Sequence, residues 1–218
     1  MTAAGAALAL GCQKNSPTSP TDTTTPGTTG GSTNAACAVT PTETVGPYPS
    51  LADFFRSDIR EGKPGAPLTL TITVVNTNNN CSPVSGVNVE IWQCDAAGNY
   101  SQYGTQTSQT YLRGIQTTNA GGQVTFLTVY PGWYQGRATH IHVEVTRNGA
   151  SAKVTQIAFP ESTNAAVYGT GVYASRGANP TANARDGIFA DSLNSELATV
   201  SGDAASGLTA NFQVAIAV

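Results

Sequence analysis

An alternation of apolar and polar residues, repeated in short runs between turn residues, constrains the fold of this chain more than any other feature. Successive residues of a strand point to opposite faces, so a period of two predicts a strand with one apolar face. Short strands at near-regular spacing, separated by turns rich in Gly, Pro and Asn, predict an all-β fold, an antiparallel β-sandwich with few short helices. The runs are LTLTITVVN (68–76), VNVEIWQC (87–94), QVTFLTVY (123–130), HIHVEVT (140–146), KVTQIAF (153–159) and LTANFQVAIAV (208–218).

Helices are expected in only two places, near residues 51–56 and 192–198. The 23 glycines and 12 prolines fit a chain with many turns. No Gly-rich phosphate-binding loop follows a strand, and no internal repeat is evident, so a nucleotide-binding or repeat architecture is not indicated.

The first 36 residues differ in composition from the rest. MTAAGAALALGC (residues 1–12) resembles the end of a lipoprotein-type export signal, in which Cys12 becomes lipidated. Residues 13–36 are mainly Thr, Ser, Pro and Gly, which predicts a disordered tether. We therefore expect a β-sandwich domain at 37–218 that is exported, either as a membrane-tethered lipoprotein or as a periplasmic or extracellular protein.

Charge and cysteine usage limit the partners. The net charge is −3 and the ten Lys and Arg residues are scattered, so nucleic acid is not an expected partner. No apolar stretch is long enough to span a bilayer. Export permits disulfides, and the three cysteines of the domain, Cys37, Cys81 and Cys94, allow one bond or none. Cys81 and Cys94 flank one strand-like run and are one possible pair.

Both histidines of the chain lie in YPGWYQGRATHIHVEV (130–145), one residue apart. In a strand, His140 and His142 point to the same face, while Ile141 points to the other. Two adjacent imidazoles can form half of a metal site. An isolated pair also occurs as ordinary surface or hydrogen-bonded histidines, so further ligands must lie nearby before a metal is indicated.

Tyrosines, rather than acids or thiols, accompany this pair. No Cys or carboxylate beside the histidines completes a zinc or ferrous site, and Glu144 lies further along the strand. A phenol has an ordinary pKa of about 10 and ionises near neutral pH only against a strong cation. Ferric iron is such a cation, because a hard trivalent ion suits anionic oxygen. The nearby phenols are Tyr100, Tyr103, Tyr111, Tyr130 and Tyr134.

Five segments, in order along the chain, resemble the intradiol ring-cleavage dioxygenases, which include the catechol 1,2- and protocatechuate 3,4-dioxygenases. The resemblance covers about residues 37–159 and is nearest to the compact, often exported, single-domain members of that family. The segments are TPTETVGPYP (40–49), SGVNVEIWQCDAAGNYS (85–101), LRGIQTTNAGGQVTFLTVYPGWY (112–134), GRATHIH (136–142) and TQIAFP (155–160).

The resemblance implies a non-haem Fe(III) site with four protein ligands. The tyrosinate ligands are Tyr100 of G-N-Y, for which Tyr103 is the nearby alternative, and Tyr134 of P-G-W-Y. The imidazole ligands are His140 and His142. Tyr134 lies only six residues before His140, closer than in the larger members of the family, which implies a differently shaped pocket beside the metal.

The same resemblance implies roles for residues around the metal. Arg137, three residues before the first histidine, is expected to be catalytic by stabilising negative charge on the substrate. Gln156 is expected behind the ligands and Tyr48 at the pocket rim, with Trp133 and Ile115 as pocket walls. Ordinary surface, strand, turn or packing roles are the alternatives for these residues.

The implied function is cleavage of a catechol-type aromatic by O2 between its two hydroxyl-bearing carbons, giving a cis,cis-muconate-type diacid. Tyr134 is also expected to act catalytically, by leaving the metal and taking up a catechol proton. The alternatives are an exported β-sandwich binding module and a dioxygenase-like protein that has lost activity. Four candidate ligands at the family spacing favour the enzyme. Catechol, protocatechuate, hydroxyquinol and larger lignin-derived phenols all remain open as substrates.

Overall fold

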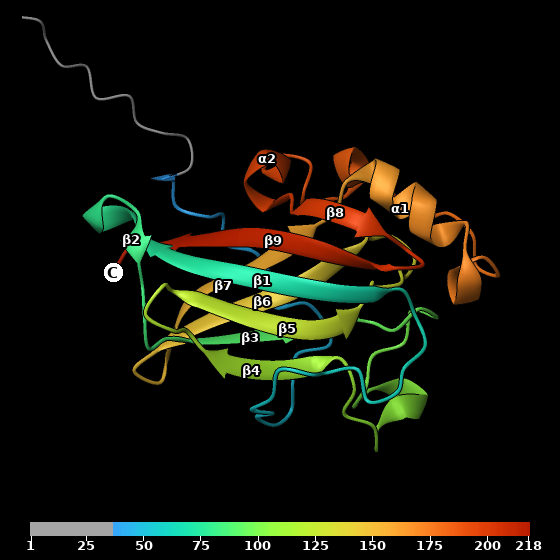
Figure 1. Ribbon diagram of the computed structural model, residues 1–218, viewed down its shortest axis with the longest axis horizontal. Helices are drawn as coiled ribbons and strands as arrows, with labels where there is room; N and C mark the ends of the chain where they lie inside the picture. The colour runs from blue at the N-terminus through green and yellow to red at the C-terminus, as the bar shows by residue number, and fades with distance from the viewer. Residues whose placement is uncertain (1–36) are drawn as a thin grey trace, which may run out of the picture. The chain divides into compact units, whose positions relative to one another are not determined.

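Two β-sheets packed face to face form the part of the chain that the computed structural model describes, residues 37–218 (Figure 1). The larger sheet has the strand order β2-β1-β9-β8, with β5 also paired to β1, and the smaller sheet has the order β4-β3-β6-β7. The strands of the larger sheet are β1 (Pro67–Asn76), β2 (Ser82–Pro83), β5 (Gln123–Val129), β8 (Thr199–Asp203) and β9 (Gly207–Ile216). Those of the smaller sheet are β3 (Asn88–Trp92), β4 (Arg113–Thr117), β6 (His140–Arg147) and β7 (Ala150–Ala158).

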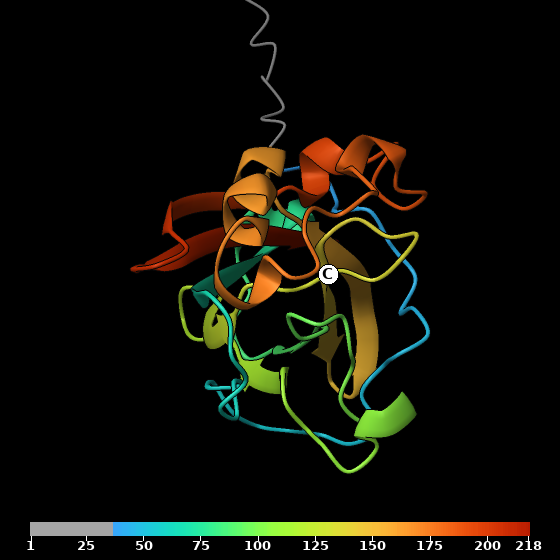
Figure 2. The same ribbon diagram turned by 90° about the vertical axis from the view of Figure 1, so that its right-hand side faces the viewer.

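Both α-helices lie on the β8 side of the sandwich (Figures 1 and 2). Within residues 37–218, no helix is long and apolar enough to cross a membrane. The α-helices are α1 (Glu161–Tyr168) and α2 (Leu193–Glu196). Single 3-10 turns occur at Thr77–Asn79, Gly104–Gln106, Gly171–Tyr173 and Asn183–Arg185.

The hydrophobic core fills the space between the two sheets. Every second residue of β1, from Leu68 to Val74, is at most 2% exposed. Each such side chain gains about 1.5–3 kcal/mol by leaving water. The smaller sheet contributes its own alternating apolar residues to the same core, namely Val89, Ile91, Ile141, Val143, Val145 and Ile157.

The β-sandwich predicted from the alternation is confirmed, and each predicted run contains a strand. One pairing differs from the antiparallel expectation, because β9 runs parallel to β1. The chain enters β9 through an antiparallel hairpin with β8, and this hairpin delivers β9 beside β1 in the same direction. Strands β2, β4 and β8 were not predicted, since SP, RGIQT and TVSGD are too short and polar to show the alternation.

The helix predicted near residues 51–56 is wrong. The segment runs alongside β4 instead: the Arg56 N–H donates to the Ile115 carbonyl, and the Ile115 N–H donates to the Phe54 carbonyl. Backbone groups that bond to a neighbouring strand are not available for bonds within a helix. The helix expected near 192–198 is confirmed as α2. Helix α1 was not predicted, because ESTNAAVY shows little apolar periodicity.

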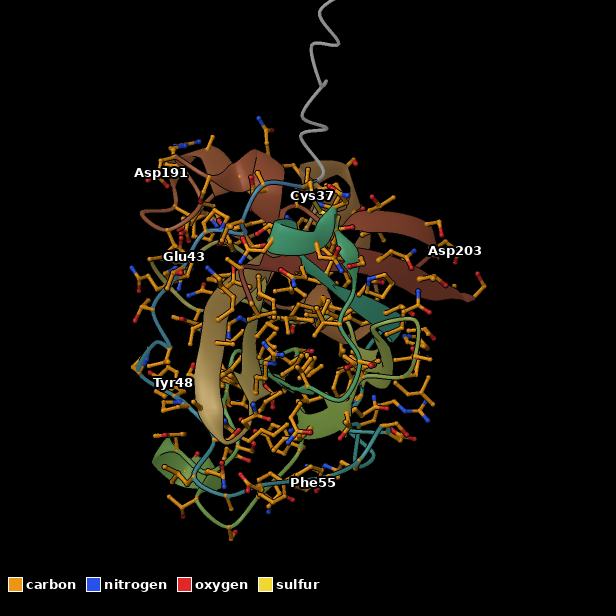
Figure 3. The ribbon with its side chains drawn as sticks, turned by 90° about the vertical axis from the view of Figure 1, so that its left-hand side faces the viewer. Cys37, Glu43, Tyr48, Phe55, Asp191 and Asp203 are labelled. Carbon is orange, nitrogen blue, oxygen red and sulfur yellow. A yellow bond between two sulfur atoms is a disulfide. The ribbon has the colours of Figure 1, made fainter. Side chains whose placement is uncertain are left out.

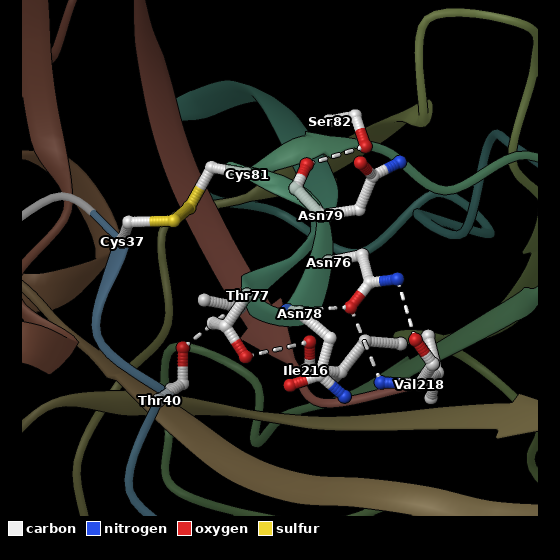
Figure 4. The surroundings of a disulfide bond; sticks show 11 residues. Cys37, Thr40, Asn76, Thr77, Asn78, Asn79, Cys81, Ser82, Ile216 and Val218 are labelled. Carbon is white, nitrogen blue, oxygen red and sulfur yellow. Dashed lines mark hydrogen bonds between the residues drawn. A yellow bond between two sulfur atoms is a disulfide. The ribbon is translucent and has the colours of Figure 1, made fainter.

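The predicted export signal (1–12, with Cys12) and the predicted tether (13–36) lie outside the described residues. A disulfide joins Cys37 to Cys81 in the turn between β1 and β2 (Figure 4). The same turn is held to the end of the chain, because the Val218 N–H donates to the Asn76 side-chain oxygen at 3.2 Å. The pair Cys81–Cys94 considered from the sequence is not formed, and Cys94 is free and buried.

Residues 38–50, which we call the strap, run from this disulfide across the edge and outer face of the smaller sheet. In Figure 3, Cys37, Glu43 and Tyr48 follow one another down one side of the molecule. The Glu43 N–H donates to the Val154 carbonyl of the edge strand β7. The strap therefore crosses the face of the sheet on which the candidate ligands lie.

Candidate metal centre

The candidate histidine ligands lie on the outer face of the smaller sheet. Strand pairing sets four side chains in one row across this sheet, Arg113 of β4, Trp92 of β3, His142 of β6 and Gln156 of β7. Alternation sends this row outward and intervening residues such as Ile141 into the core. None of the four is more than 1% exposed, because the strap and the loops between strands cover the outer face.

His140 and His142 project side by side, as the alternation predicts. Their Nε2 atoms are 3.2 Å apart, and the Tyr134 hydroxyl lies 3.3 Å from the Nε2 of His140. Tyr134 reaches this point because the Pro131–Gly132 turn packs tightly: a Cβ at Gly132 would lie 2.3 Å from the Asp95 carbonyl oxygen. Three atoms that can bind a metal, the Tyr134 hydroxyl oxygen and the two histidine Nε2 atoms, therefore lie within hydrogen-bond distance of their neighbours.

Tyr100 approaches the same point from the loop after β3. Its ring centroid is 5.8 Å from that of Tyr134 and 6.4 Å from that of His142. Among the described residues, its buried hydroxyl has no hydrogen-bond partner. Such a group is costly unless something binds it, and a metal ligand role would satisfy it. The alternative ligand, Tyr103, instead donates its hydroxyl to the Pro49 carbonyl at 2.7 Å.

Burial keeps both imidazoles neutral. It lowers the pKa of His140 to about 3, with a further contribution from the Arg137 charge, and it lowers the pKa of His142 well below the ordinary value. The His140 Nδ1 lies 2.6 Å from the Ala138 carbonyl oxygen, which can only accept, so Nδ1 carries the proton. The lone pair on Nε2 then faces Tyr134 and His142 and is available to a metal.

The donor set fits a ferric ion. Burial raises the pKa of Tyr100 and of Tyr134 in the protein without a cation, so each phenol ionises only when a bound cation offsets that cost. Burial also raises the pKa of the neighbouring Cys94 to about 12, which keeps it a thiol. Across residues 37–218, no three His, Cys, Asp or Glu side chains are placed to hold a metal, so a metal here depends on the tyrosines. Two phenolates with two imidazoles suit a hard trivalent ion.

Arg137 lies beside these ligands and is held from two directions. It donates through Nη2 to the Gln156 side-chain oxygen at 2.6 Å and through Nε to the Asp186 carboxylate at 2.9 Å. Gln156 in turn donates to the Thr44 carbonyl of the strap at 3.0 Å. Burial tends to raise the pKa of Asp186, but the hydrogen bonds from Arg137 and from the Ala138 and Ile188 N–H groups, with the Arg137 charge, together outweigh it and the pKa is lowered. The Arg137 charge is therefore paired and its orientation fixed.

Sequence reasoning missed Asp186. It lies 49 positions from Arg137, beyond the segments that resemble the family, and no local motif marks it among the 13 acidic residues. Only the way the segment after α1 packs over the outer face brings the two together.

The strap brings Tyr48 and Gly46 against the site. The Tyr48 ring stacks on Tyr100, with 4.7 Å between centroids and 26° between planes. The His142 ring lies between Trp92, stacked at 4.9 Å, and Gly46, where a Cβ would lie 2.8 Å from the His142 Cε1. Gly46 also has φ +72°, a conformation that favours glycine, so both space and backbone exclude a side chain there.

The two predicted pocket walls, Trp133 and Ile115, are placed by contacts with other parts of the chain. Trp133 donates its ring N–H to the Gly177 carbonyl at 3.1 Å and carries Arg176 over its ring at 4.3 Å. Ile115 shares the outer face but is two residues along β4 from the row that contains His142, a distance of about 7 Å. Their roles in a substrate pocket stay predictions.

A small cleft of about 130 Å³ is lined by three tyrosines, Tyr48, Tyr100 and Tyr103. Its lining is made of aromatic rings, amide and hydroxyl side chains and glycines, and no charged side chain is among them. The lining residues are Tyr48, Gly98, Asn99, Tyr100, Tyr103, Gly104, Thr105 and Gln106.

Known proteins share both sequence and fold with this chain. A family model described as Dioxygenase matches residues 49–176. The chain is 32% identical over 114 residues to a catechol 1,2-dioxygenase of Candida albicans, and 30% identical over 122 residues to a protocatechuate 3,4-dioxygenase beta chain of Burkholderia cepacia. These matches span 42% and 50% of this chain but only 38% and 51% of the two relatives.

Among solved structures, an intradiol ring-cleavage dioxygenase from Tetranychus urticae has a similar fold. The TM-score is 0.74 at 33% identity, and the match covers 83% of this chain and 95% of that one. The chain belongs to the intradiol ring-cleavage dioxygenase family. The resemblance inferred from the five sequence segments is therefore confirmed.

Proposed function

We propose that this protein uses O2 to cleave a catechol-type ring between its two hydroxyl-bearing carbons, at an Fe(III) ion held by Tyr100, Tyr134, His140 and His142. The observation that carries the proposal is the convergence of the Tyr134 hydroxyl and the two Nε2 atoms, with separations of 3.3 and 3.2 Å, beside the partnerless Tyr100 hydroxyl. Family membership supports it. The product is a cis,cis-muconate-type diacid that contains both atoms of O2.

The two tyrosines are suited to different tasks. When bound, Fe(III) orients both catechol oxygens and draws electron density from the ring, which makes the ring reactive toward O2. Tyr134 would hold the metal from a loop and is only partly buried, so its phenolate would be able to take up a catechol proton as a general base. Tyr100 is 4% exposed and lies under Tyr48, so it stays in place.

Arg137 stabilises negative charge on the substrate. Its guanidinium is held by Gln156 and Asp186, so it is oriented before the substrate binds. A preorganised cation of this kind lowers the free energy of an anionic transition state without having to move. The uncharged lining of the cleft beside Tyr48 favours catechols without a charged ring substituent.

Oxygen uptake by the Fe(III)-reconstituted protein against a panel of catechols tests this function. The panel includes catechol, hydroxyquinol, protocatechuate and larger neutral catechols. We expect a red to burgundy protein, from tyrosinate-to-iron charge transfer, and muconate-type absorbance in the product. A protein that stays colourless after reconstitution refutes the ligand set, and a product cleaved beside the two hydroxyl-bearing carbons refutes the intradiol reaction.

We also propose that the domain works in an oxidising compartment, outside the cytoplasm. The Cys37–Cys81 disulfide supports this, since structural disulfides persist where thiols are not kept reduced. Non-reducing peptide mass spectrometry of the natively produced protein should find a peptide that links these two cysteines. Free thiols at both positions would contradict the proposal.

A further inference from the structure

Arg113 is a buried arginine whose partners are not carboxylates. It begins β4, where its side chain lies on the outer face opposite Trp92, and it is 0% exposed. Within residues 37–218, its guanidinium forms no ion pair. A buried charge is tolerated only where its donors are hydrogen-bonded, so its acceptors determine its role.

The acceptors of Arg113 belong to two separate segments. Along one edge of the guanidinium, Nε donates to the Ser101 hydroxyl at 2.9 Å and Nη2 to the Ser101 carbonyl at 2.7 Å. On the other side, Nη1 donates to the Tyr48 carbonyl at 3.0 Å and to the Ser50 hydroxyl at 3.3 Å. These bonds join β4 both to the loop that carries Tyr100 and to the strap.

The loop on the Tyr100 side contains two strained backbone positions. Gln102, next to Ser101, has φ +68°, and Leu112, next to Arg113, has φ +56°. Residues other than glycine rarely adopt this left-handed conformation, and it persists only where the surroundings fix it. The two bonds between Arg113 and Ser101 tie the ends of this loop together, beside both strained positions.

Each clamped segment places one tyrosine at the site. Tyr100 directly precedes Ser101, and the Tyr48 carbonyl is itself one of the acceptors. The two rings stack at 4.7 Å, and the Arg113 guanidinium carbon lies 5.9 Å from the centroid of the Tyr100 ring. Arg113 therefore helps to set the relative position of the two tyrosines, beside the Tyr103–Pro49 and Leu51–Gln102 hydrogen bonds that join the same parts of the chain.

We propose that Arg113 is a positioning residue that clamps the Tyr100 loop to the strap, so that Tyr100 and Tyr48 meet the histidines in one fixed arrangement. The catalytic meaning of this arrangement rests on the proposed function, whereas the clamp is a property of the chain without iron. The planar fork of an arginine serves both segments at once. A lysine ammonium is a compact point charge on a flexible stem and does not hold both.

Hydrogen exchange of the iron-free protein tests the clamp directly. Mass spectrometry reads peptides that cover residues 47–51 and 100–106, in which the Leu51 N–H donates to the Gln102 side chain. In Arg113→Met, both peptides should exchange roughly ten- to a hundredfold faster than in the wild type, because bonds from a charged donor are lost. Arg113→Lys should restore little of this protection, since it keeps the charge but not the fork.

Arg56→Met is the matched control. Arg56 also donates to two backbone carbonyls, those of Arg113 and Thr110, but it forms no hydrogen bond with residues 47–51 or 100–106, which the two peptides cover. Both peptides should exchange at the wild-type rate in this variant. If Arg113→Met does not fold, Ser101→Ala removes the acceptor of Nε, together with the bond from the Ser101 hydroxyl to the Tyr111 carbonyl, and keeps the bonds of Nη1 and Nη2. It should accelerate the same peptides to a smaller extent.

The iron-loaded protein gives a second readout. Arg113→Met should shift or weaken the Tyr100 component of the charge-transfer absorption, whereas Arg56→Met should leave the spectrum unchanged. Equal exchange in these two variants, or wild-type exchange in Arg113→Lys, overturns the clamp. A wild-type protein that stays colourless with Fe(III) yet shows the expected exchange overturns the proposed function and leaves the clamp standing.

Discussion

The two faces of the smaller sheet come from the same strands, yet they are buried for different reasons. The inner face is closed by the apolar side chains of the larger sheet, and the outer face by the strap and by loops that offer hydrogen-bonding groups and aromatic rings. Both faces exclude water, so burial alone does not distinguish them. The inner face presents Val89, Ile91, Ile141, Val143 and Ile157, and the outer face presents Arg113, Trp92, His142 and Gln156.

The difference shows how one sheet can serve both stability and chemistry. Alternation gives every strand residue on one face a neighbour on the other, so the packing that fixes Ile141 also fixes His140 and His142. Two residues of the outer row are buried with their polar atoms hydrogen-bonded, Arg113 to Ser101 and Tyr48, and Gln156 to Arg137 and Thr44. Among the described residues, the Trp92 Nε1 and the His142 Nδ1 have no partner. Substitutions on the two faces should therefore have separable effects.

The largest expected effect comes from the outer face, with His142→Ala. This variant removes a candidate ligand and leaves the inner face intact. Fe(III) affinity should fall by more than about a hundredfold, because losing even an outer-shell partner of a metal costs up to about that much. Elemental analysis and the charge-transfer absorption measure the loss. Iron and colour retained in the variant would remove His142 from the ligand set.

The neighbouring inner-face variant, Ile141→Ala, should show the opposite pattern. Ile141 is 0% exposed, and its truncation should lower the free energy of unfolding by about 2–5 kcal/mol. The folded protein should still bind Fe(III) as the wild type does. Denaturant titration of the iron-free protein gives the first quantity, and iron content under native conditions the second. If folded Ile141→Ala loses its iron, the two faces are not separable.

Glu196 is an exception to the apolar character of the inner face, because its carboxyl group is buried at the edge of that face. It accepts a hydrogen bond from Thr155 of β7 at 3.1 Å. Burial raises its pKa to about 7, although the Ser192 hydroxyl bound to it opposes the shift. The folded state therefore binds the proton more tightly than the unfolded chain, in which the pKa is about 4.3.

The contribution of Glu196 to stability should be complete below about pH 4.3 and should be lost as the pH rises through about 7. Glu196→Gln keeps the neutral form at every pH. It should unfold like the wild type at low pH and be more stable by roughly 1–3 kcal/mol at pH 8. Urea unfolding across pH measures this difference, and a difference that does not change with pH would contradict the shift.

The smallest expected effects on stability come from two tyrosines on either side of the Pro131–Gly132 turn, Tyr130 and Tyr134, which should differ in their effect on the absorption. The Tyr134 hydroxyl faces the histidines, whereas the Tyr130 hydroxyl donates to the Asn164 side chain in the core at 2.7 Å. Tyr130→Phe should cost about 1–3 kcal/mol, because it leaves a buried acceptor unpaired, and should not change the absorption. Tyr134→Phe should remove one charge-transfer component and slow turnover, with stability changed by only about 0.5 kcal/mol. Equal spectra for both variants would exclude Tyr134 as a ligand.

The sequence was sufficient for the parts of the molecule that depend on local periodicity. Alternation predicted the main strands, and it placed His140 and His142 on one face with Ile141 on the other. Tyr134 and Arg137 lie in the same short stretch as the histidines, so their closeness followed from the chain itself. Tyr100 needed the family resemblance, since it lies on another strand connection.

The sequence was insufficient where function depends on how irregular segments pack. Arg137 meets Asp186 across 49 positions, and Arg113 meets the Tyr48 carbonyl across 65. The helix expected near residues 51–56 failed for the same reason, because that segment bonds to β4, which was itself not predicted. No periodicity encodes such contacts, which are fixed only when the strap and loops close over the sheet.

The Cys37–Cys81 bond also determines how mechanical load reaches this domain. A pull on the chain ahead of Cys37 enters through a covalent link at the turn after β1. That strand is paired with β9 from Leu68 to Asn76 and with β5 from Pro67 to Thr73, so the force is spread along two long ladders. The force does not pass through the strap. Gly46 therefore keeps its contact with His142, and Tyr48 keeps its contact with Tyr100.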